Sequence, residues 1–273
     1  MLIVNPSQVK PLLWAVDPGI ISYNASRIGL PIPIALLVWS GGDIWPDLSS
    51  RGNNGILGGS AAFVANYVDF PGANDSVSIS IDLSPYDQIT IFSTFQADAW
   101  TDTDILWEYS ANFNDETDAF VCLRSAGGPI LGTAKGADYV QWGTTTSPAA
   151  NTEYNLAVTY DRPANAIRGY LNGILDGSET LSSMLNGNFG NHTLFIGARA
   201  GTQLELDGRM KCFYIFGQVF NSSQAAILSA NPYGLVQPPE RVWAVEDVVV
   251  GLSIMNQLQG SNMGADLYNG TLL

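Results

Sequence analysis

The chain has 273 residues, of which 46% are hydrophobic and only 13% charged, and its formal net charge is −14. This much apolar material with so little charge excludes a disordered chain, and the negative balance argues against nucleic-acid binding, because phosphates repel acidic surfaces. Two interpretations of the acidity stay open: it keeps the protein soluble, or some carboxylates hold Ca²⁺.

The sequence separates into three regions. Residues 1–36 contain prolines and follow no clear period, and we expect them to form an N-terminal arm. Residues 37–236 carry a strand pattern. Residues 237–273 begin with the structure-breaking pair Pro238-Pro239 and continue as a largely apolar stretch, which we expect to form a C-terminal arm.

Neither a signal peptide nor a membrane span is expected. The first residues have no basic leader and no long apolar run, so we expect synthesis in a cytoplasm. The apolar stretch from Ile28 to Trp39 is interrupted by Pro31 and Pro33 and is shorter than the about 20 residues that a span needs.

The middle region reads as strands. Residues 89–95 are apolar on both faces, which predicts a central strand, and residues 154–160 alternate apolar and polar side chains as a half-buried strand does. Asn172-Gly173 stands between two apolar pairs and predicts a hairpin, since both turn positions need a positive φ.

The end of this region adds two strands and one helix. Strands are predicted at residues 194–197 and 208–216, and a short helix at residues 224–229. Either Asn221 or Ser222 caps the helix, and it ends at Asn231-Pro232.

Three segments together resemble laminin G-like domains. Residues 45–55, Trp-Pro-Asp-Leu-Ser-Ser-Arg-Gly-Asn-Asn-Gly, are similar to the Asp-x-Ser-Gly-Asn-x-Asn-Gly opening of that family. Residues 68–79 are similar to its Phe-x-Gly-x-x-Asp-x-Val-x-Ile strand pair, and residues 154–234 follow its order of strands, turn and terminal helix. The resemblance implies an all-β fold, a two-sheet antiparallel jelly-roll sandwich of the concanavalin A-like kind with extended N- and C-terminal arms.

A further resemblance concerns the end of the sandwich. Residues 232–243, Pro-Tyr-Gly-Leu-Val-Gln-Pro-Pro-Glu-Arg-Val-Trp, resemble the exit of such domains in bacteriophage structural proteins. The resemblance implies a non-enzymatic structural protein of a phage virion, as capsid decoration or as part of a tail or fibre. Its partners would then be other virion proteins and copies of itself, and its location the virion.

Catalytic patterns are sparse. The only histidine is His192, beside a Gly-Asn turn, and we expect it to be solvated rather than part of a catalytic triad. Glycosidases of the concanavalin A-like fold carry Glu-x-Asp-x-x-Glu on one strand, whereas here Glu205 and Asp207 are followed by Met210 in place of the second glutamate. We therefore expect no enzyme, with a glycoside hydrolase and a free lectin or carbohydrate-binding module as the alternatives.

Aromatic and acidic side chains are the candidate glycan contacts, because aromatic faces stack on the apolar face of a sugar ring. For the tryptophans at positions 100 and 107, packing in the core is the alternative. The candidates are Trp100, Asp102, Asp104, Trp107, Tyr139 and Trp142.

Calcium is the only cofactor considered. By resemblance to laminin G-like and pentraxin domains, which hold Ca²⁺ at a rim of the sandwich, Asp69, Asn74 and Asp75 are its candidate ligands. Cys122 and Cys212 both stand in apolar strand-like runs, so we expect two buried free thiols, with a disulfide as the alternative.

The C-terminal region supplies the candidate anchor. An apolar segment within it is suited to adding a strand to a neighbour or filling a groove. Its residues are Val248, Val249, Val250, Leu252 and Ile254.

Overall fold

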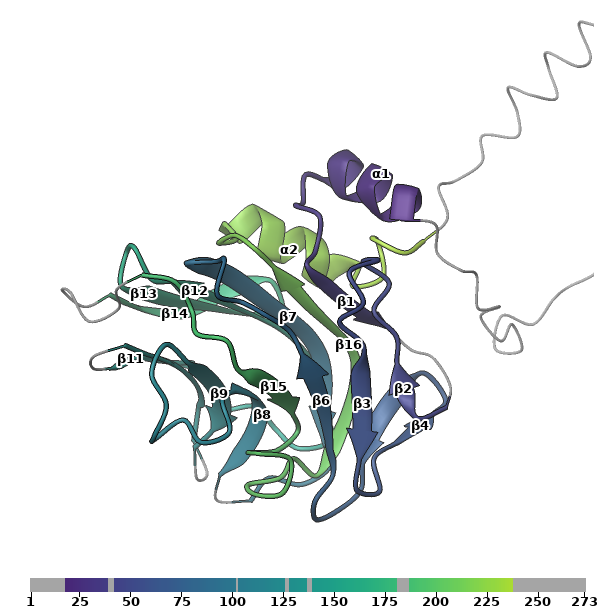
Figure 1. Cartoon of the computed structure of the whole chain (residues 1–273), viewed down its shortest axis with the longest axis vertical. Coiled ribbons are helices and arrows are strands. Elements are labelled where there is room, and N and C mark those ends of the chain that lie inside the picture. The colour runs from purple at the N-terminus through teal and green to yellow at the C-terminus, as the bar shows by residue number, and fades with distance from the viewer. Residues whose placement is uncertain are drawn as a thin grey trace, which may run out of the picture. The chain divides into compact units, whose positions relative to one another are not determined.

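The computed structural model describes residues 18–38, 42–101, 103–125, 128–136, 139–180 and 187–237. Within these residues the fold is two antiparallel sheets stacked face to face (Figure 1), which confirms the predicted all-β jelly-roll sandwich. The anchor residues Val248, Val249, Val250, Leu252 and Ile254 lie outside the described part of the chain, as does most of the predicted C-terminal arm.

Each sheet has eight strands among the described residues. Sheet A runs in the order β14 (Ile174–Thr180), β13 (Ala166–Leu171), β12 (Glu153–Asp161), β7 (Gln88–Ala97), β16 (Gly208–Phe216), β5 (Tyr67–Phe70) and β4 (Ala62–Val64), and β1 (Ala35–Val38) also pairs with β16. Sheet B runs in the order β11 (Tyr139–Gly143), β10 (Ile130–Lys135), β9 (Phe120–Arg124), β8 (Asp104–Tyr109), β15 (Thr193–Ile196), β6 (Ser76–Ser80), β3 (Gly55–Gly58) and β2 (Ile44–Trp45).

Aromatic side chains fill the space between the sheets. Trp107 of sheet B meets Phe213 of sheet A edge to face at 5.6 Å between ring centroids, and both are fully buried. The indole of Trp142 lies against Gly169 of β13, where a Cβ would come within 1.8 Å of the ring. A glycine on one sheet thus makes room for a tryptophan on the other, which is how large and small residues interdigitate in a close-packed core.

Two helices cover the outer face of sheet A (Figure 1): α1 (Pro18–Ile28) and α2 (Ser222–Ala230). Ile21 of α1 and Leu228 of α2 join a second buried cluster with Phe92 and Tyr214 of the sheet. The side-chain amide of Asn24 ties α1 to the segment after α2 by donating to a backbone carbonyl at 2.7 Å. Sheet A is therefore buried on both faces, as a central strand that is apolar on both faces requires.

The strands, the hairpin and the helix predicted in the middle region are confirmed, but the strand predicted to be half-buried, β12, is buried on both faces from Leu156 onward because the helices cover the outer face of sheet A. The hairpin turn falls at Asn172 and Gly173, whose φ angles are +52° and +80°. Helix α2 begins after Asn221, whose side chain accepts a hydrogen bond from the backbone N–H of Gln224 in a capping box. At the N-terminal side, residues 18–36 contain α1 and the start of β1, so part of the predicted arm packs on or joins sheet A.

The two cysteines are free and lie on different sheets, Cys122 on β9 of sheet B and Cys212 on β16 of sheet A. Cys122 is buried between the sheets, whereas Cys212 is buried under the helices. Burial raises the pKa of both thiols, that of Cys212 to about 11. The prediction of two buried free thiols is confirmed, and the two cysteines form no disulfide in this structure, where they belong to different buried clusters.

No helix in the described ranges combines the length and the apolar character needed to cross a membrane.

Candidate functional site

The predicted glycan contacts do not gather into one surface. Trp107 and Trp142 are buried in the core with 0% and 2% of their surface exposed, so neither ring has a face available to a sugar. Trp100 is half-buried at the edge of the core, with the guanidinium of Arg124 4.8 Å above its ring. Tyr139 is 54% exposed, on the edge strand β11.

The two acidic candidates among the predicted glycan contacts are Asp104 and Asp102. Asp104 is fully buried, and its carboxylate accepts hydrogen bonds from the backbone N–H and the hydroxyl of Thr101. Burial raises the pKa of Asp104. Asp102 lies outside the described residues. Asp104 thus closes a loop at the start of β8 and does not face solvent.

Two of the predicted calcium ligands, Asp69 and Asp75, are engaged in contacts within the sandwich. Both carboxylate oxygens of Asp75 already accept backbone N–H groups, from Ser60 at 2.5 Å and from Gly72 at 2.7 Å. Asp69 lies opposite Arg209 in the β5–β16 ladder, and burial together with the nearby Asp98 raises its pKa. Across the described ranges, no three His, Cys, Asp or Glu side chains gather where a metal ion could bind.

The acid pair proposed for glycoside hydrolysis lies on a loop. Glu205 and Asp207 precede β16, which begins at Gly208, and a Glu205 oxygen accepts the backbone N–H of Asn74 at 3.2 Å. Because neither acid is on a strand, the alternation of side chains along a strand does not direct both carboxylates into one cleft.

His192 is less solvated than expected. Its Nδ1 lies 2.6 Å from the Glu116 carboxylate and its Nε2 lies 3.0 Å from the Thr117 carbonyl oxygen, so it holds the loop between β8 and β9.

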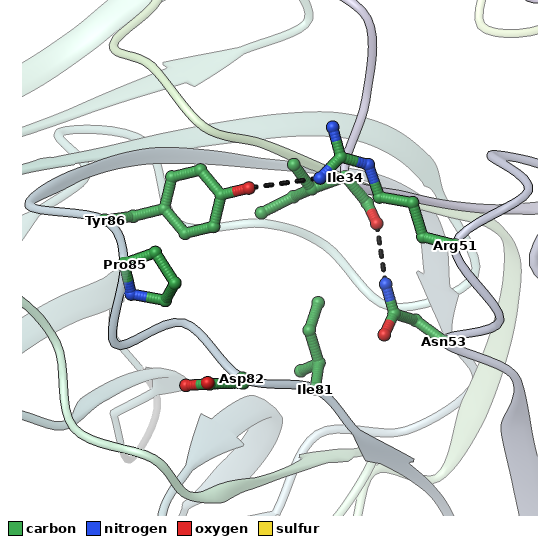
Figure 2. Close-up of a pocket in the computed structure, with 7 residues that line it drawn as sticks. All are labelled: Ile34, Arg51, Asn53, Ile81, Asp82, Pro85 and Tyr86. Carbon is green, nitrogen blue, oxygen red and sulfur yellow. Dashed lines mark hydrogen bonds between the residues drawn. The ribbon is translucent and has the colours of Figure 1, made fainter.

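A pocket of about 440 Å³ opens where the chain passes from one sheet to the other (Figure 2). The segment between β6 of sheet B and β7 of sheet A forms one side, and the loop between β2 and β3 forms the other. Its lining residues are Ile34, Arg51, Asn53, Ile81, Asp82, Pro85 and Tyr86.

One wall of the pocket is built around Asp47. One carboxylate oxygen of Asp47 accepts the backbone N–H groups of Leu36 at 3.0 Å and Ser49 at 2.8 Å. The other accepts the backbone N–H of Asn53 at 2.9 Å and the Ser49 hydroxyl at 2.8 Å. These four hydrogen bonds fold residues 47–53 into a compact loop and so place Arg51 and Asn53 at the pocket.

The opposite wall is a tight turn. The backbone N–H of Tyr86 donates to the Leu83 carbonyl at 2.9 Å, and the ring of Tyr86 lies over Gly217, where a Cβ would come within 2.5 Å of it. Arg51 bridges the two walls by donating from Nη1 to the Tyr86 hydroxyl at 3.2 Å (Figure 2). The pocket therefore has a fixed shape, held by backbone contacts on both sides.

Apolar and polar groups are separated within the pocket. Ile34 and Ile81 are 4% and 5% exposed and supply apolar surface. The amide of Asn53 donates to the Ile34 carbonyl at 2.7 Å, which orients it and leaves its oxygen as an acceptor.

The charges in the pocket are those of Arg51 and Asp82. Hydrogen bonds from the hydroxyl and backbone N–H of Ser84 hold the pKa of Asp82 below its usual value, so this carboxylate is ionised at neutral pH. Figure 2 shows the Asp82 carboxylate turned away from Arg51. The ion pairs formed among the described residues involve Arg162, His192, Arg199, Arg209 and Lys211, and none of them involves Arg51.

Arg51 and Asn53 lie within the segment that resembles the laminin G-like opening, but the sequence alone indicates no role for them. The motif Asp-x-Ser-Gly-Asn-x-Asn-Gly has no cation, whereas this chain has Arg51 between Ser49 and Asn53. This added arginine is the feature of the sequence that could have indicated the pocket. The sequence from Asp82 to Tyr86 indicates only a turn. Its closeness to Arg51 in space depends on the fold.

Comparison with known proteins places this sandwich in a lectin-like class. The pattern of the concanavalin A-like lectin/glucanases superfamily, in its laminin G-like branch, matches residues 64–226, more than half of the chain. The chain therefore belongs to this superfamily. Of the pocket residues, Ile81, Asp82, Pro85 and Tyr86 fall inside the matched segment, whereas Ile34, Arg51 and Asn53 precede it.

Solved structures with the same fold have dissimilar sequences. The ligand-binding domain of botulinum neurotoxin serotype D, in complex with N-acetylneuraminic acid, matches with a TM-score of 0.60 and 11% identity over 77% of this chain and 52% of that one. The receptor-binding domain of botulinum neurotoxin type G matches with a TM-score of 0.56 and 17% identity over 72% and 51%.

A sialidase from Trypanosoma rangeli, in complex with a difluorinated sugar acid, matches with a TM-score of 0.57 and 14% identity over 81% and 39%. This chain thus spans about half the length of the neurotoxin domains that it resembles. No curated protein matches the sequence. At these identities the likeness shows the fold alone.

Proposed function

We propose that this chain is a non-catalytic, lectin-like module that binds glycans in the pocket between Arg51 and Tyr86. The observation that carries the proposal is the composition of that pocket. It combines an aromatic ring, an amide oxygen and a guanidinium around a partly apolar hollow. Its volume of about 440 Å³ lies within the usual range of about 300–1,000 Å³ for small-molecule sites.

Each of these groups has a counterpart on a sugar. The rings of Tyr86 and Pro85 offer flat apolar surface for the C–H face of a pyranose. The side-chain oxygen of Asn53 accepts from a hydroxyl, and the guanidinium of Arg51 donates to one. The superfamily match supports the proposal, because its name covers both lectins and glucanases.

The absence of catalysis is also part of the proposal. It is supported by the place of Glu205 and Asp207 on a loop before β16, and by Met210 standing where the glycosidase pattern has its second glutamate. Turnover of β-glucans by the purified chain, lost in a Glu205→Gln, Asp207→Asn variant, would contradict this part.

We further propose that the module is displayed in many copies on a bacteriophage virion. The support is the resemblance of residues 232–243 to the exit of such domains in phage structural proteins. Many copies of a shallow site gain avidity of about 10²–10⁴ over one site without new contacts. Deleting residues 238–273 should abolish incorporation into the particle and leave the sandwich folded, whereas normal incorporation of that truncation would contradict the anchoring role.

A glycan array tests the binding proposal. The labelled full-length chain should bind a subset of glycans, and Tyr86→Ala should reduce binding by roughly tenfold or more, since an aromatic contact contributes on the order of 1–3 kcal/mol. Tyr139→Ala is the matched control, because it removes an exposed tyrosine on β11. Loss of binding in Tyr139→Ala but not in Tyr86→Ala would move the site to sheet B and refute the assignment.

A further inference from the structure

We propose that the pocket selects sugars that carry a carboxylate, such as sialic acids or uronic acids, and that Arg51 is the residue that selects them. This inference rests on the proposed glycan-binding function and names its ligand class.

Arg51 has hydrogen-bonding capacity left for a ligand. A guanidinium has five N–H donors in a planar fork that matches the two oxygens of a carboxylate. The Arg51 side chain uses Nη1 on the neutral hydroxyl of Tyr86, and among the described residues no carboxylate lies within ion-pair distance of it. A ligand carboxylate would supply the missing counter-charge.

Two buried or half-buried arginines are already paired with carboxylates of the protein. Arg199 lies 2.9 Å from the buried carboxylate of Glu108, and Arg162 donates to Asp118 at 2.5 Å. Each of these two guanidinium groups therefore already has a carboxylate of the protein as its partner. Arg51 differs, since it is exposed, lines a pocket and is positioned by the Asp47 loop rather than by a partner charge.

The remaining pocket groups suit the rest of such a sugar. Tyr86 and Pro85 lie along the side that a ring would face, and Asn53 lies next to Arg51 (Figure 2). Asp82 is an anion at the rim, and its carboxylate is turned away from Arg51. It is placed to accept hydroxyl donors at the outer end of the sugar, while its charge opposes an acidic ligand at longer range.

Acid and ester pairs of the same sugar test the inference. The methyl glycosides of N-acetylneuraminic acid and glucuronic acid are titrated against their methyl esters at 0.15 M salt, with the wild-type full chain, Arg51→Gln and Asp82→Asn. The wild type should bind at least one acid roughly 10- to 100-fold more tightly than its ester, as a charge-assisted bidentate contact implies. Arg51→Gln should bring that ratio to about 1 or below, because the guanidinium contact to the carboxylate is lost while the like charge of Asp82 remains. Asp82→Asn should tighten binding of the acid by roughly two- to fivefold through removal of a like charge.

The outcomes separate the two proposals. Equal binding of acid and ester by the wild type, or a ratio that survives in Arg51→Gln, overturns the selection of acids while the glycan site stands. An array that reports only neutral glycans, lost in Tyr86→Ala, does the same. Binding of no glycan at all removes the proposed function and the inference with it.

Discussion

The Asp47 carboxylate organises the loop that carries Arg51 and Asn53, so its removal should weaken both the fold and the pocket. Asp47→Ala leaves three backbone N–H groups without their acceptor, those of Leu36, Ser49 and Asn53. Leu36 is fully buried, and a buried unpaired donor costs about 1–3 kcal/mol. Ser49 and Asn53 lie in a partly exposed loop, where each lost hydrogen bond costs about 0.5–1.5 kcal/mol.

The total destabilisation should therefore be about 2–6 kcal/mol, which for a domain of this size lowers Tm by roughly 4–24 °C. Scanning calorimetry and urea titration measure it. Asp87→Ala is the matched control, because Asp87 is exposed and its carboxylate makes no hydrogen bond within the described residues, so its effect should stay within about 0.5 kcal/mol. Equal stabilities of the two variants would refute the role given to Asp47.

Three further predictions concern the core and its titratable groups. Trp142→Ala should cost about 3–5 kcal/mol because the indole is buried, whereas Tyr139→Ala on the same strand should cost less than about 0.5 kcal/mol, and a reversed order in urea titrations would contradict the inward placement of the indole. Burial raises the pKa of Asp104, so the folded state keeps this proton at a pH where the unfolded chain has lost it. The contribution of Asp104 to stability therefore falls as pH rises from about 4 through the folded pKa, and Asp104→Asn should gain stability relative to the wild type across that range, while a pH-independent difference would count against it. Cys122 and Cys212, both with raised pKa, should react with a thiol reagent only after unfolding, and rapid labelling of the native protein would show that the burial is wrong.

The sequence was most informative where side-chain period and turn chemistry decide the structure. The strand at residues 154–160 and the turn at Asn172-Gly173 depend on local geometry, and the structure has both. The alternation did not predict that helices cover the outer face of this strand, so its polar side is buried as well. The same alternation at β11 indicates which aromatic faces inward. Val140 and Trp142 share the buried face, while Tyr139 and Gln141 share the exposed one, so strand period distinguishes a core tryptophan from a surface tyrosine.

The pocket could not be predicted from the sequence, because it is formed by segments that only the fold brings together. Ile34, Arg51 and Tyr86 come from three separate connections, and they meet where the chain crosses between sheets. For Asp75 the obstacle is different: the partners of its carboxylate are backbone N–H groups, which no residue pattern reveals. A carboxylate that closes a turn and one that binds Ca²⁺ therefore look alike in the sequence.

A crystal structure of the full chain with the tightest-binding sugar from the array tests the central claim most directly. We expect the sugar ring beside Tyr86 and Pro85, with Arg51 donating to the ligand. A sugar bound instead on the outer face of sheet B, at Tyr139 or near Trp100, with the Arg51 pocket empty, would contradict it.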